Sequence, residues 1–195
     1  MVFIDLISRP TKRYFRARST LSLFENHLEG ITKLIDIGAG TCRISKYIRE
    51  NFLVNVVPLD IVDYNKTDLK LTLYDGKRIP YKDGAFDVAL LIFVIHHSDD
   101  QEMVLNEAIR VARKLIILED TPRNPIEVGM WHFWDWLLNL GRDFSMPHSS
   151  RKDEDWLCLF ESLGFKLVEK KCFRLGFSFF WSYQQSLYVL ERRRR

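Results

Sequence analysis

Residues 34–45, which read LIDIGAGTCRIS, place the strongest constraint on what this chain can fold into. Apolar strand-forming residues lead to Asp36, the chain then passes through Gly38 and Gly40, and helix-forming residues follow. Strand, glycine loop and helix in this order begin a nucleotide-binding α/β unit. Arg43 stands where a pyrophosphate-binding loop has its third glycine, and the Gly-Lys-Ser/Thr of a triphosphate-binding loop is absent. The pattern therefore predicts a nucleoside ligand of another kind.

The predicted ligand carries an amino acid as well as a nucleoside. Glycines let the backbone approach a ligand closely, and the N-terminus of the following helix favours a carboxylate. Asp36 supplies a negative charge that suits an ammonium group. Asp60 follows the next predicted strand at the usual distance for ribose hydroxyls, and Asp75 follows the third strand, where it suits an adenine amino group. These carboxylates are expected to line one crevice, where open α/β sheets bind ligands.

Strand and helix patterns alternate along most of the chain. Strands are predicted at 33–37, 54–59, 69–74, 86–95, 115–118, 165–173 and 184–191. Helices are predicted at 41–51, from a capping box at 98–101 to about Arg113, over 130–140, and from 150–153 to Gly164. This order predicts an α/β fold, a Rossmann-like three-layer sandwich around a mostly parallel seven-stranded sheet with an antiparallel last strand. One domain is expected over residues 1–195.

Composition narrows the class of protein. The net charge is only +3, less than the run Arg192–Arg195 contributes, so a DNA-binding role is not expected. The three cysteines have no C-x-x-C spacing, no His/Asp/Glu cluster has convincing metal-ligand spacing, and the predicted metal content is none. The longest apolar run, Val88–Ile95, is far below the ~20 residues that cross a bilayer. A cytoplasmic protein is expected.

Four motifs in this order resemble those of class I S-adenosylmethionine-dependent methyltransferases, particularly the small type 11 group. They are LIDIGAGTCRIS, PLD, YDGKRIPYKDGAFDVALLIFVIHH and EAIRVARKLIILED, and the resemblance covers roughly residues 20–120. It implies S-adenosylmethionine as cofactor, S-adenosylhomocysteine as product, and a small-molecule acceptor. It also implies a role for each matching residue: Asp36, Gly38 and Gly40 for the methionine part, Asp60 for the ribose, Asp75 and Gly76 for the adenine, and Leu91 and Ile92 for the sulfonium.

The chain departs from the family pattern at two points. Cys42 stands where the family usually has a third glycine, and it is interpreted as a small filler rather than as a low-pKa redox thiol. The connection from Asp60 to Asp75 is too short for the customary helix. That shortness leaves Asp63 as the alternative ribose ligand.

Candidate catalytic residues follow the fourth predicted strand. His96 and His97 lie at the methyl-transfer face, where a base takes a proton from an attacking O–H or N–H group. Strand alternation is expected to turn one of them toward the crevice and the other into the core. Glu119 and Asp120 end the fifth strand at the same edge, as a substrate contact or as part of a solvated loop.

The segment 130–140 is unusually rich in tryptophan. Its aromatic side chains fall on nearly every side of a helix, so one buried stripe does not account for them all. Within the resemblance, residues 121–149 form a substrate-side insertion for an apolar or aromatic acceptor, and the alternative is a homodimer interface. The candidate acceptor-binding residues are Glu119, Trp131, Asp135, Trp136 and His148.

Other function classes stay open at this level. Residues 1–20 form a basic arm, interpreted as a lid, with RNA binding or RNA methylation as the alternative. A catalytically silent cofactor-binding subunit is a further alternative, because of Cys42 and the short connection before Asp75. The terminal arginines, 192–195, are expected to form a tail.

Overall fold

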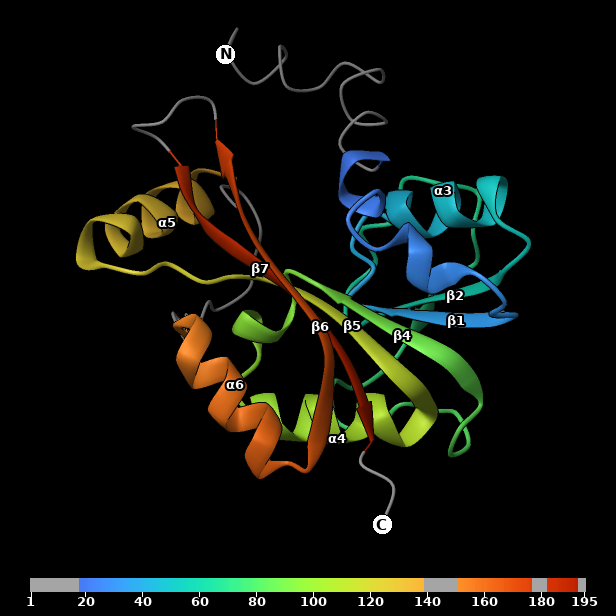
Figure 1. The fold of residues 1–195 in the computed structure, drawn as a ribbon. Helices are drawn as coiled ribbons and strands as arrows, with labels where there is room; N and C mark the ends of the chain where they lie inside the picture. Colours follow the sequence, from blue (N-terminus) through green and yellow to red (C-terminus); the bar gives the residue numbers. More distant parts are fainter. Residues whose placement is uncertain (1–17, 139–150, 177–181, 193–195) are drawn as a thin grey trace, which may run out of the picture.

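The computed structural model describes residues 18–138, 151–176 and 182–192, and these ranges form one seven-stranded sheet (Figure 1). The strand order is β3-β2-β1-β4-β5-β7-β6. The strands are β1 (Lys33–Ile37), β2 (Asn55–Asp60), β3 (Thr72–Leu73), β4 (Phe86–Ile92), β5 (Ala112–Asp120), β6 (Phe165–Gly176) and β7 (Ser182–Arg192). β7 runs antiparallel to both of its neighbours, and every other pair is parallel. The predicted sheet is confirmed.

Helices cover both faces of the sheet, which gives the predicted three layers. In Figure 1, α4 (Gln101–Val111) and α6 (Asp153–Ser162) lie on one face, and α3 (Arg43–Asn51) lies on the other together with η1 (Glu25–Leu28). A longer helix, α5 (Pro125–Leu138), lies beside the β6–β7 hairpin. Among the described helices, none is long and apolar enough to cross a membrane.

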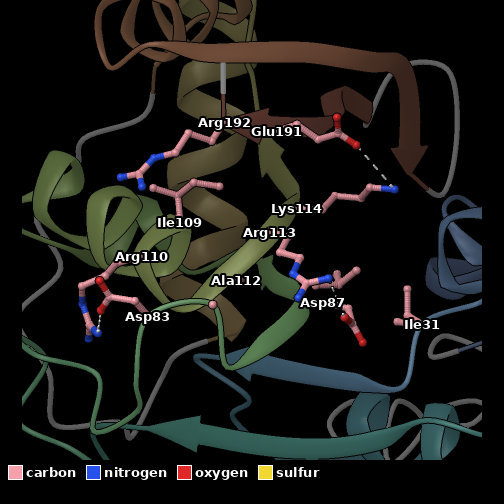
Figure 2. A pocket seen from close by; sticks show the side chains of 12 residues that line it. Ile31, Asp83, Asp87, Ile109, Arg110, Ala112, Arg113, Lys114, Glu191 and Arg192 are labelled. Atoms are coloured by element: carbon pink, nitrogen blue, oxygen red, sulfur yellow. Dashed lines mark hydrogen bonds and ion pairs between the residues drawn. The ribbon is translucent and has the colours of Figure 1, made fainter. Parts of the chain in front are cut away.

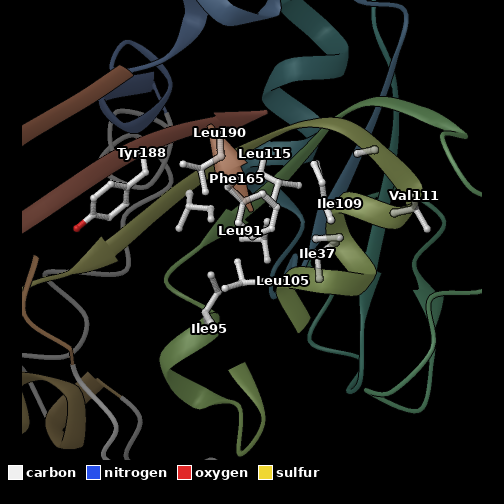
Figure 3. Close-up of a cluster of buried hydrophobic side chains, with 14 of the residues drawn as sticks. Ile37, Leu91, Ile95, Leu105, Ile109, Val111, Leu115, Phe165, Tyr188 and Leu190 are labelled. Atoms are coloured by element: carbon white, nitrogen blue, oxygen red, sulfur yellow. The ribbon is translucent and has the colours of Figure 1, made fainter. Parts of the chain in front are cut away.

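The core is divided between the two faces because strand side chains alternate. In β1, Leu34 packs with the cluster under α3, whereas Ile35 and Ile37 pack with the cluster under α4 and α6. Figure 3 shows the second cluster, in which Leu91 of β4 and Leu105 of α4 meet. This two-sided burial holds the carboxyl ends of the parallel strands at one edge of the sheet.

Two predicted strands are shorter than expected. β3 contains only Thr72 and Leu73, because the Asn65 side chain bonds to Thr67 and to the Leu69 carbonyl and folds the preceding segment into turns. No helix forms in residues 61–71, as the short connection predicted. β4 ends at Ile92 rather than at residue 95, since the backbone turns sharply there.

The predicted capping box of α4 is wrong in its residues. Asp100 caps the helix, and its side chain accepts a hydrogen bond from Met103 N at 2.9 Å. The Ser98 hydroxyl instead accepts from Asp100 N at 3.2 Å, while the side-chain oxygen Oε1 of Gln101 accepts from Arg151 Nε at 2.5 Å. Asp100 is the last residue before the helix, and its carboxylate reaches the exposed N–H groups directly.

Candidate functional site

The two glycines after β1 serve different purposes. Gly38 and Ala39 donate their N–H groups to the Leu59 carbonyl at 2.8 and 3.1 Å, which ties the loop to β2. Gly38 has φ +72°, and a Cβ there would lie 2.2 Å from Val94 Cγ2. Gly40 has φ +52°, and a Cβ there would meet nothing within 4 Å. Gly38 is therefore required by packing, whereas Gly40 borders open space.

Two carboxylates stand on either side of this loop. Asp36 is buried in β1 and accepts a hydrogen bond from Ser45 Oγ of α3 at 2.5 Å. Burial raises the pKa of Asp36 to about 6, against the lowering effect of the Ser45 bond. Asp60, at the end of β2, accepts from Gly40 N and Ile61 N, both at 2.7 Å. Asp60 thus holds Gly40 in place from the neighbouring strand β2.

The third predicted carboxylate lies on the far side of β2. Asp75 follows β3, is exposed, and accepts from Lys77 N at 2.9 Å and Arg78 N at 3.0 Å. These N–H groups lower the pKa of Asp75 below its ordinary value. Gly76 next to it has φ +77°. The alternative ribose ligand, Asp63, is exposed in the connection after β2.

Cys42 is the last residue before α3 and has a left-handed backbone, with φ +57°. That conformation favours glycine, so the family's third glycine would fit without strain. The side chain is fully buried, and burial raises the pKa of the Cys42 thiol to about 12. A redox thiol needs a lowered pKa. The redox alternative is therefore wrong, and the burial agrees with a small filler.

The candidate histidines lie on a 3-10 turn, η2 (Ile95–His97), that follows the end of β4. Leu91 and Ile92 end the strand, and Phe93 then turns the chain with φ +53° while its N–H donates to the Leu118 carbonyl at 2.8 Å. Strand alternation does not set the directions of the histidines, because the strand has already ended. Their ring centroids lie 4.0 Å apart. His96 is buried and His97 is partly exposed.

Glu119 fixes this turn from the end of β5. Its side chain is fully buried and accepts from Val94 N at 3.1 Å and from Ile95 N at 2.7 Å. Its other oxygen lies 2.5 Å from His96 Nδ1. The solvated-loop alternative for Glu119 is therefore wrong. The carboxylate holds both the backbone of the turn and one imidazole.

Asp120, the next residue, joins β5 to α5 and β7. Its two oxygens accept from Trp131 Nε1 at 2.9 Å and from Gln185 Nε2 at 2.6 Å. The buried Trp131 ring meets His96 edge to face, with centroids 5.7 Å apart. Burial raises the pKa of Asp120 to about 6, although nearby His96 acts in the opposite direction. Sequence analysis missed Gln185, because its partner lies 65 positions away along the chain.

A second buried carboxylate, also missed from the sequence, fastens α5 to the hairpin. Glu127 accepts from Arg123 at 3.0 Å and from Arg174 of β6 at 2.9 Å, and from Gln184 N of β7 at 3.4 Å. The i,i+4 spacing of Arg123 and Glu127 is the local signal that predicts part of this cluster. The remaining partners come from another part of the chain.

Some predicted acceptor-binding residues lie outside what the structure describes. His148 falls between the described ranges, and the side chains of Asp135 and Trp136 are not described, although their backbone belongs to α5. Phe133 of the same helix has 47% of its surface exposed. Of the predicted acceptor residues, Glu119 and Trp131 are brought together with His96.

A cavity of about 610 Å³ lies at the opposite, amino-terminal edge of the sheet (Figure 2). Several of its charged side chains are paired with one another, as in Arg110–Asp83 at 2.9 Å and Lys114–Glu191 at 3.9 Å. No predicted site residue lines it. Within the described residues, no group of three or more His, Cys, Asp or Glu side chains is placed to hold a metal ion.

Comparison with known proteins finds similarity to methyltransferases. Residues 35–116 match the family model of a methyltransferase domain. A ubiquinone/menaquinone biosynthesis C-methyltransferase of Geobacter sp. (strain M21) is 27% identical over 126 residues, 55% of this chain and 54% of the relative. Norajmaline N-methyltransferase of Rauvolfia serpentina is 43% identical over 53 residues, 26% of this chain and 18% of the relative. The chain thus spans about half of the first relative and less of the second.

Solved structures share the fold. A putative methyltransferase of Bacillus halodurans superposes with a TM-score of 0.68 at 16% identity, covering 89% of this chain and 99% of that one. A SAM-dependent methyltransferase of Methanosarcina mazei gives a TM-score of 0.68 at 14% identity, covering 87% and 96%. At these identities the superpositions establish the fold.

Proposed function

We propose that this chain, of which residues 35–116 match the methyltransferase-domain family model, is a class I S-adenosylmethionine-dependent methyltransferase of the type 11 group. In this proposal it transfers a methyl group from that cofactor to a small acceptor. The observation that carries the proposal is the group of carboxylates beside the glycine loop. Asp36 and Asp60 flank Gly40, which borders open space, and Asp75 follows the next strand. These residues fit a ligand with an ammonium group, ribose hydroxyls and an adenine.

Each of these residues has a proposed place along the cofactor. Asp36, Gly38 and Gly40 bind the methionine part, Asp60 the ribose, Asp75 and Gly76 the adenine, and the Leu91 and Ile92 backbone lies beside the sulfonium. When bound, the cofactor supplies an electrophilic methyl group on a positively charged sulfur. The protein must then align donor and acceptor and exclude water, because charge is lost in the displacement.

His96 is the proposed base, with His97 as the second candidate. Glu119 lies on Nδ1 of His96, which favours the tautomer with the proton on Nδ1 and keeps the ring in one orientation. A base must lie within hydrogen-bond reach of the proton that it removes. The turn after β4 brings both imidazoles to the carboxyl edge, where β4 itself ends.

The proposed acceptor is largely apolar or aromatic, with residues 121–149 forming much of its pocket. Trp131 lies against His96, and α5 carries the exposed ring of Phe133. The relatives include two C-methyltransferases and one N-methyltransferase, so they favour no single attacking atom. A homodimer contact through α5 is the competing explanation.

The decisive experiment is calorimetry with S-adenosylmethionine, S-adenosylhomocysteine and NAD. We expect both adenosyl compounds to bind and NAD to give no heat. Asp60→Ala is expected to weaken binding by roughly 1–3 kcal/mol, because the ribose hydroxyls lose a charged acceptor. Asp63→Ala is the matched control. If Asp63→Ala weakens binding and Asp60→Ala does not, the ribose assignment moves to Asp63; binding of NAD alone would refute the function.

Turnover separates the enzyme from the other classes of function. Protein incubated with methyl-labelled cofactor and either small-metabolite or RNA extracts is expected to label the small-molecule fraction. Label in RNA would favour the basic arm as a nucleic-acid contact. Cofactor binding without any label in either fraction would favour a silent subunit.

A further inference from the structure

A buried hydrogen-bond acceptor at the carboxyl edge has no donor among the described residues. Gln185 has only 6% of its surface exposed, and its side-chain carbonyl oxygen has no hydrogen-bond partner there. The other such atom, Trp156 Nε1, lies in the main core, where its ring stacks on Phe160. Buried polar atoms without a partner are rare in folded proteins, and each calls for an explanation.

Asp120 fixes the orientation of this amide. The Gln185 Nε2 atom donates to Asp120 at 2.6 Å. A reversed amide would place its carbonyl oxygen against the carboxylate and would leave its NH₂ group without an acceptor, so the two ends are distinguished by their surroundings. The carbonyl oxygen of Gln185 is therefore the end that requires a donor.

Asp120 has room for a donor as well. Asp120 has 9% of its surface exposed, and its carboxylate accepts from Trp131 Nε1 and Gln185 Nε2 among the described residues. An ionised carboxylate offers about four lone-pair directions, so these two bonds leave capacity for another. Because Asp120 and Gln185 are directly paired across β5 and β7, their side chains lie on the same face of the sheet. Two acceptors thus stand side by side with no shared donor.

The pair belongs to the edge where methyl transfer is proposed. Trp131, which bonds Asp120, lies edge to face against His96, and Glu119 precedes Asp120 in β5 and holds His96. One chain of contacts therefore links the Gln185 carbonyl to the proposed base. The charged neighbours of Asp120 in this cluster are Glu119 and His96.

We propose that Gln185 and Asp120 bind a hydroxyl or amino group of the methyl acceptor. This inference rests on the proposed function, and it adds that the apolar or aromatic acceptor carries a hydrogen-bond donor. An amino group donates to both side chains, and a hydroxyl donates to one of them. A site built around such bonds discriminates strongly against an analogue without the donor, because its polar groups are then left unpaired.

The test uses three aromatic probes of similar size: phenol, aniline and toluene. Protein saturated with S-adenosylhomocysteine is titrated with each probe, and dissociation constants are measured by ligand-observed NMR. We expect phenol or aniline to bind at least about tenfold more tightly than toluene, since only they donate a hydrogen bond. Gln185→Met is expected to reduce that preference to within about threefold and to leave toluene binding unchanged.

Gln184→Met on the same strand is the matched control and is expected to keep the wild-type preference. Asp120→Asn is the second test variant, in case Gln185→Met does not fold, and it too should lose the preference for aniline. Equal binding of the three probes by the wild type, or an unchanged preference in both test variants, would overturn the inference and assign the carbonyl to a structural water. Failure of S-adenosylhomocysteine to bind the wild type would instead overturn the proposed function.

Discussion

At the carboxyl edge of the sheet, the ends of β1 and β2 are joined mainly through backbone groups, whereas the ends of β5 and β7 are joined through buried side chains. In the first region, called the cofactor half after its proposed role, the Leu59 carbonyl and the Asp60 carboxylate accept from backbone N–H groups of the glycine loop. In the second region, called the acceptor half after its proposed role, Asp120 accepts from two side chains, Trp131 and Gln185. The first region therefore depends on the conformation of its backbone, whereas the second depends on each member of a side-chain network.

The two halves meet at the turn between β4 and α4. Val94 fills the space over Gly38 from this turn, and Glu119 holds the turn from the other side through Val94 N and Ile95 N. The turn is thus packed against the cofactor half and hydrogen-bonded to the acceptor half. A substitution in either half should therefore alter the position of His96, which lies on this turn.

Glu119→Ala should have the largest effect of any single change at this edge. It leaves two backbone N–H groups and His96 Nδ1 without their buried acceptor. We expect a loss of about 3–5 kcal/mol in the free energy of unfolding, measured by denaturant titration. Glu119→Gln keeps one acceptor oxygen and should lose clearly less. Equal losses for both variants would show that the charge, rather than the acceptor, stabilises the turn.

Gly38→Ala tests the same turn from the cofactor half. The new Cβ would lie 2.2 Å from Val94 Cγ2, and the backbone has φ +72°. We expect a loss of about 2–4 kcal/mol, from overpacking and from the left-handed conformation together. Gly40→Ala, which meets no neighbour, should cost only the conformational part, about 1–2 kcal/mol.

A double-mutant cycle with Val94→Ala separates the two contributions. If the contact with Val94 matters, Gly38→Ala should cost less in the Val94→Ala background than in the wild type. Additive losses would mean that only the backbone conformation requires the glycine.

The difference between the halves also explains what the sequence predicted. The loop after β1 is local: strand, glycines and helix are consecutive, so Asp36, Gly38 and Gly40 are readable in order. The acceptor half is assembled from β5, α5 and β7, and no spacing along the chain predicts that Asp120 pairs with Gln185. The mostly parallel sheet followed from the alternation of strands and helices, and the antiparallel last strand followed from the final pair of strands. The order of the strands in the sheet was not predicted.

The end of β4 was mispredicted for a similar reason. Residues 93–95 are apolar and continue the strand pattern, but Phe93 donates its N–H to Leu118 with a left-handed backbone. Apolar residues also serve to pack a turn, and Val94 does so over Gly38. Periodicity reports burial and does not by itself distinguish a buried strand from a buried turn.

Asp36→Asn tests, through the pH dependence of stability, whether the buried Asp36 carboxyl group has a raised pKa. The folded-state pKa of Asp36 is raised to about 6 from 3.8, so the folded protein binds more protons than the unfolded chain between those values. Wild-type stability from this group is therefore greatest at low pH and falls as pH rises through about 6. Between about pH 4 and about pH 7, the free energy of unfolding of Asp36→Asn should therefore rise by roughly 2–3 kcal/mol relative to that of the wild type. A difference independent of pH would contradict the raised pKa.

Asp120→Asn is the corresponding change in the acceptor half, where the carboxyl pKa is also raised to about 6. Its pH window should be the same. The absolute stability should fall more than for Asp36→Asn, because the amide's NH₂ group would face a donor at Trp131 Nε1 or at Gln185 Nε2. Denaturant titrations across the pH range measure both quantities.

Cys42 gives the smallest expected effect and tests whether the cofactor half is indeed controlled by its backbone. At an ordinary helical position, glycine is less stable than alanine by up to about 1 kcal/mol. Cys42 has φ +57°, where a Cβ costs about 1–2 kcal/mol, so Cys42→Gly should be more stable than Cys42→Ala by about 1 kcal/mol. Both variants lose the buried thiol, so that loss cancels in the comparison. Thermal unfolding measures the order, and calorimetry with S-adenosylhomocysteine measures whether affinity follows it. If Cys42→Ala proves more stable than Cys42→Gly, side-chain packing outweighs backbone conformation at this position. The cofactor half would then not be controlled mainly by its backbone.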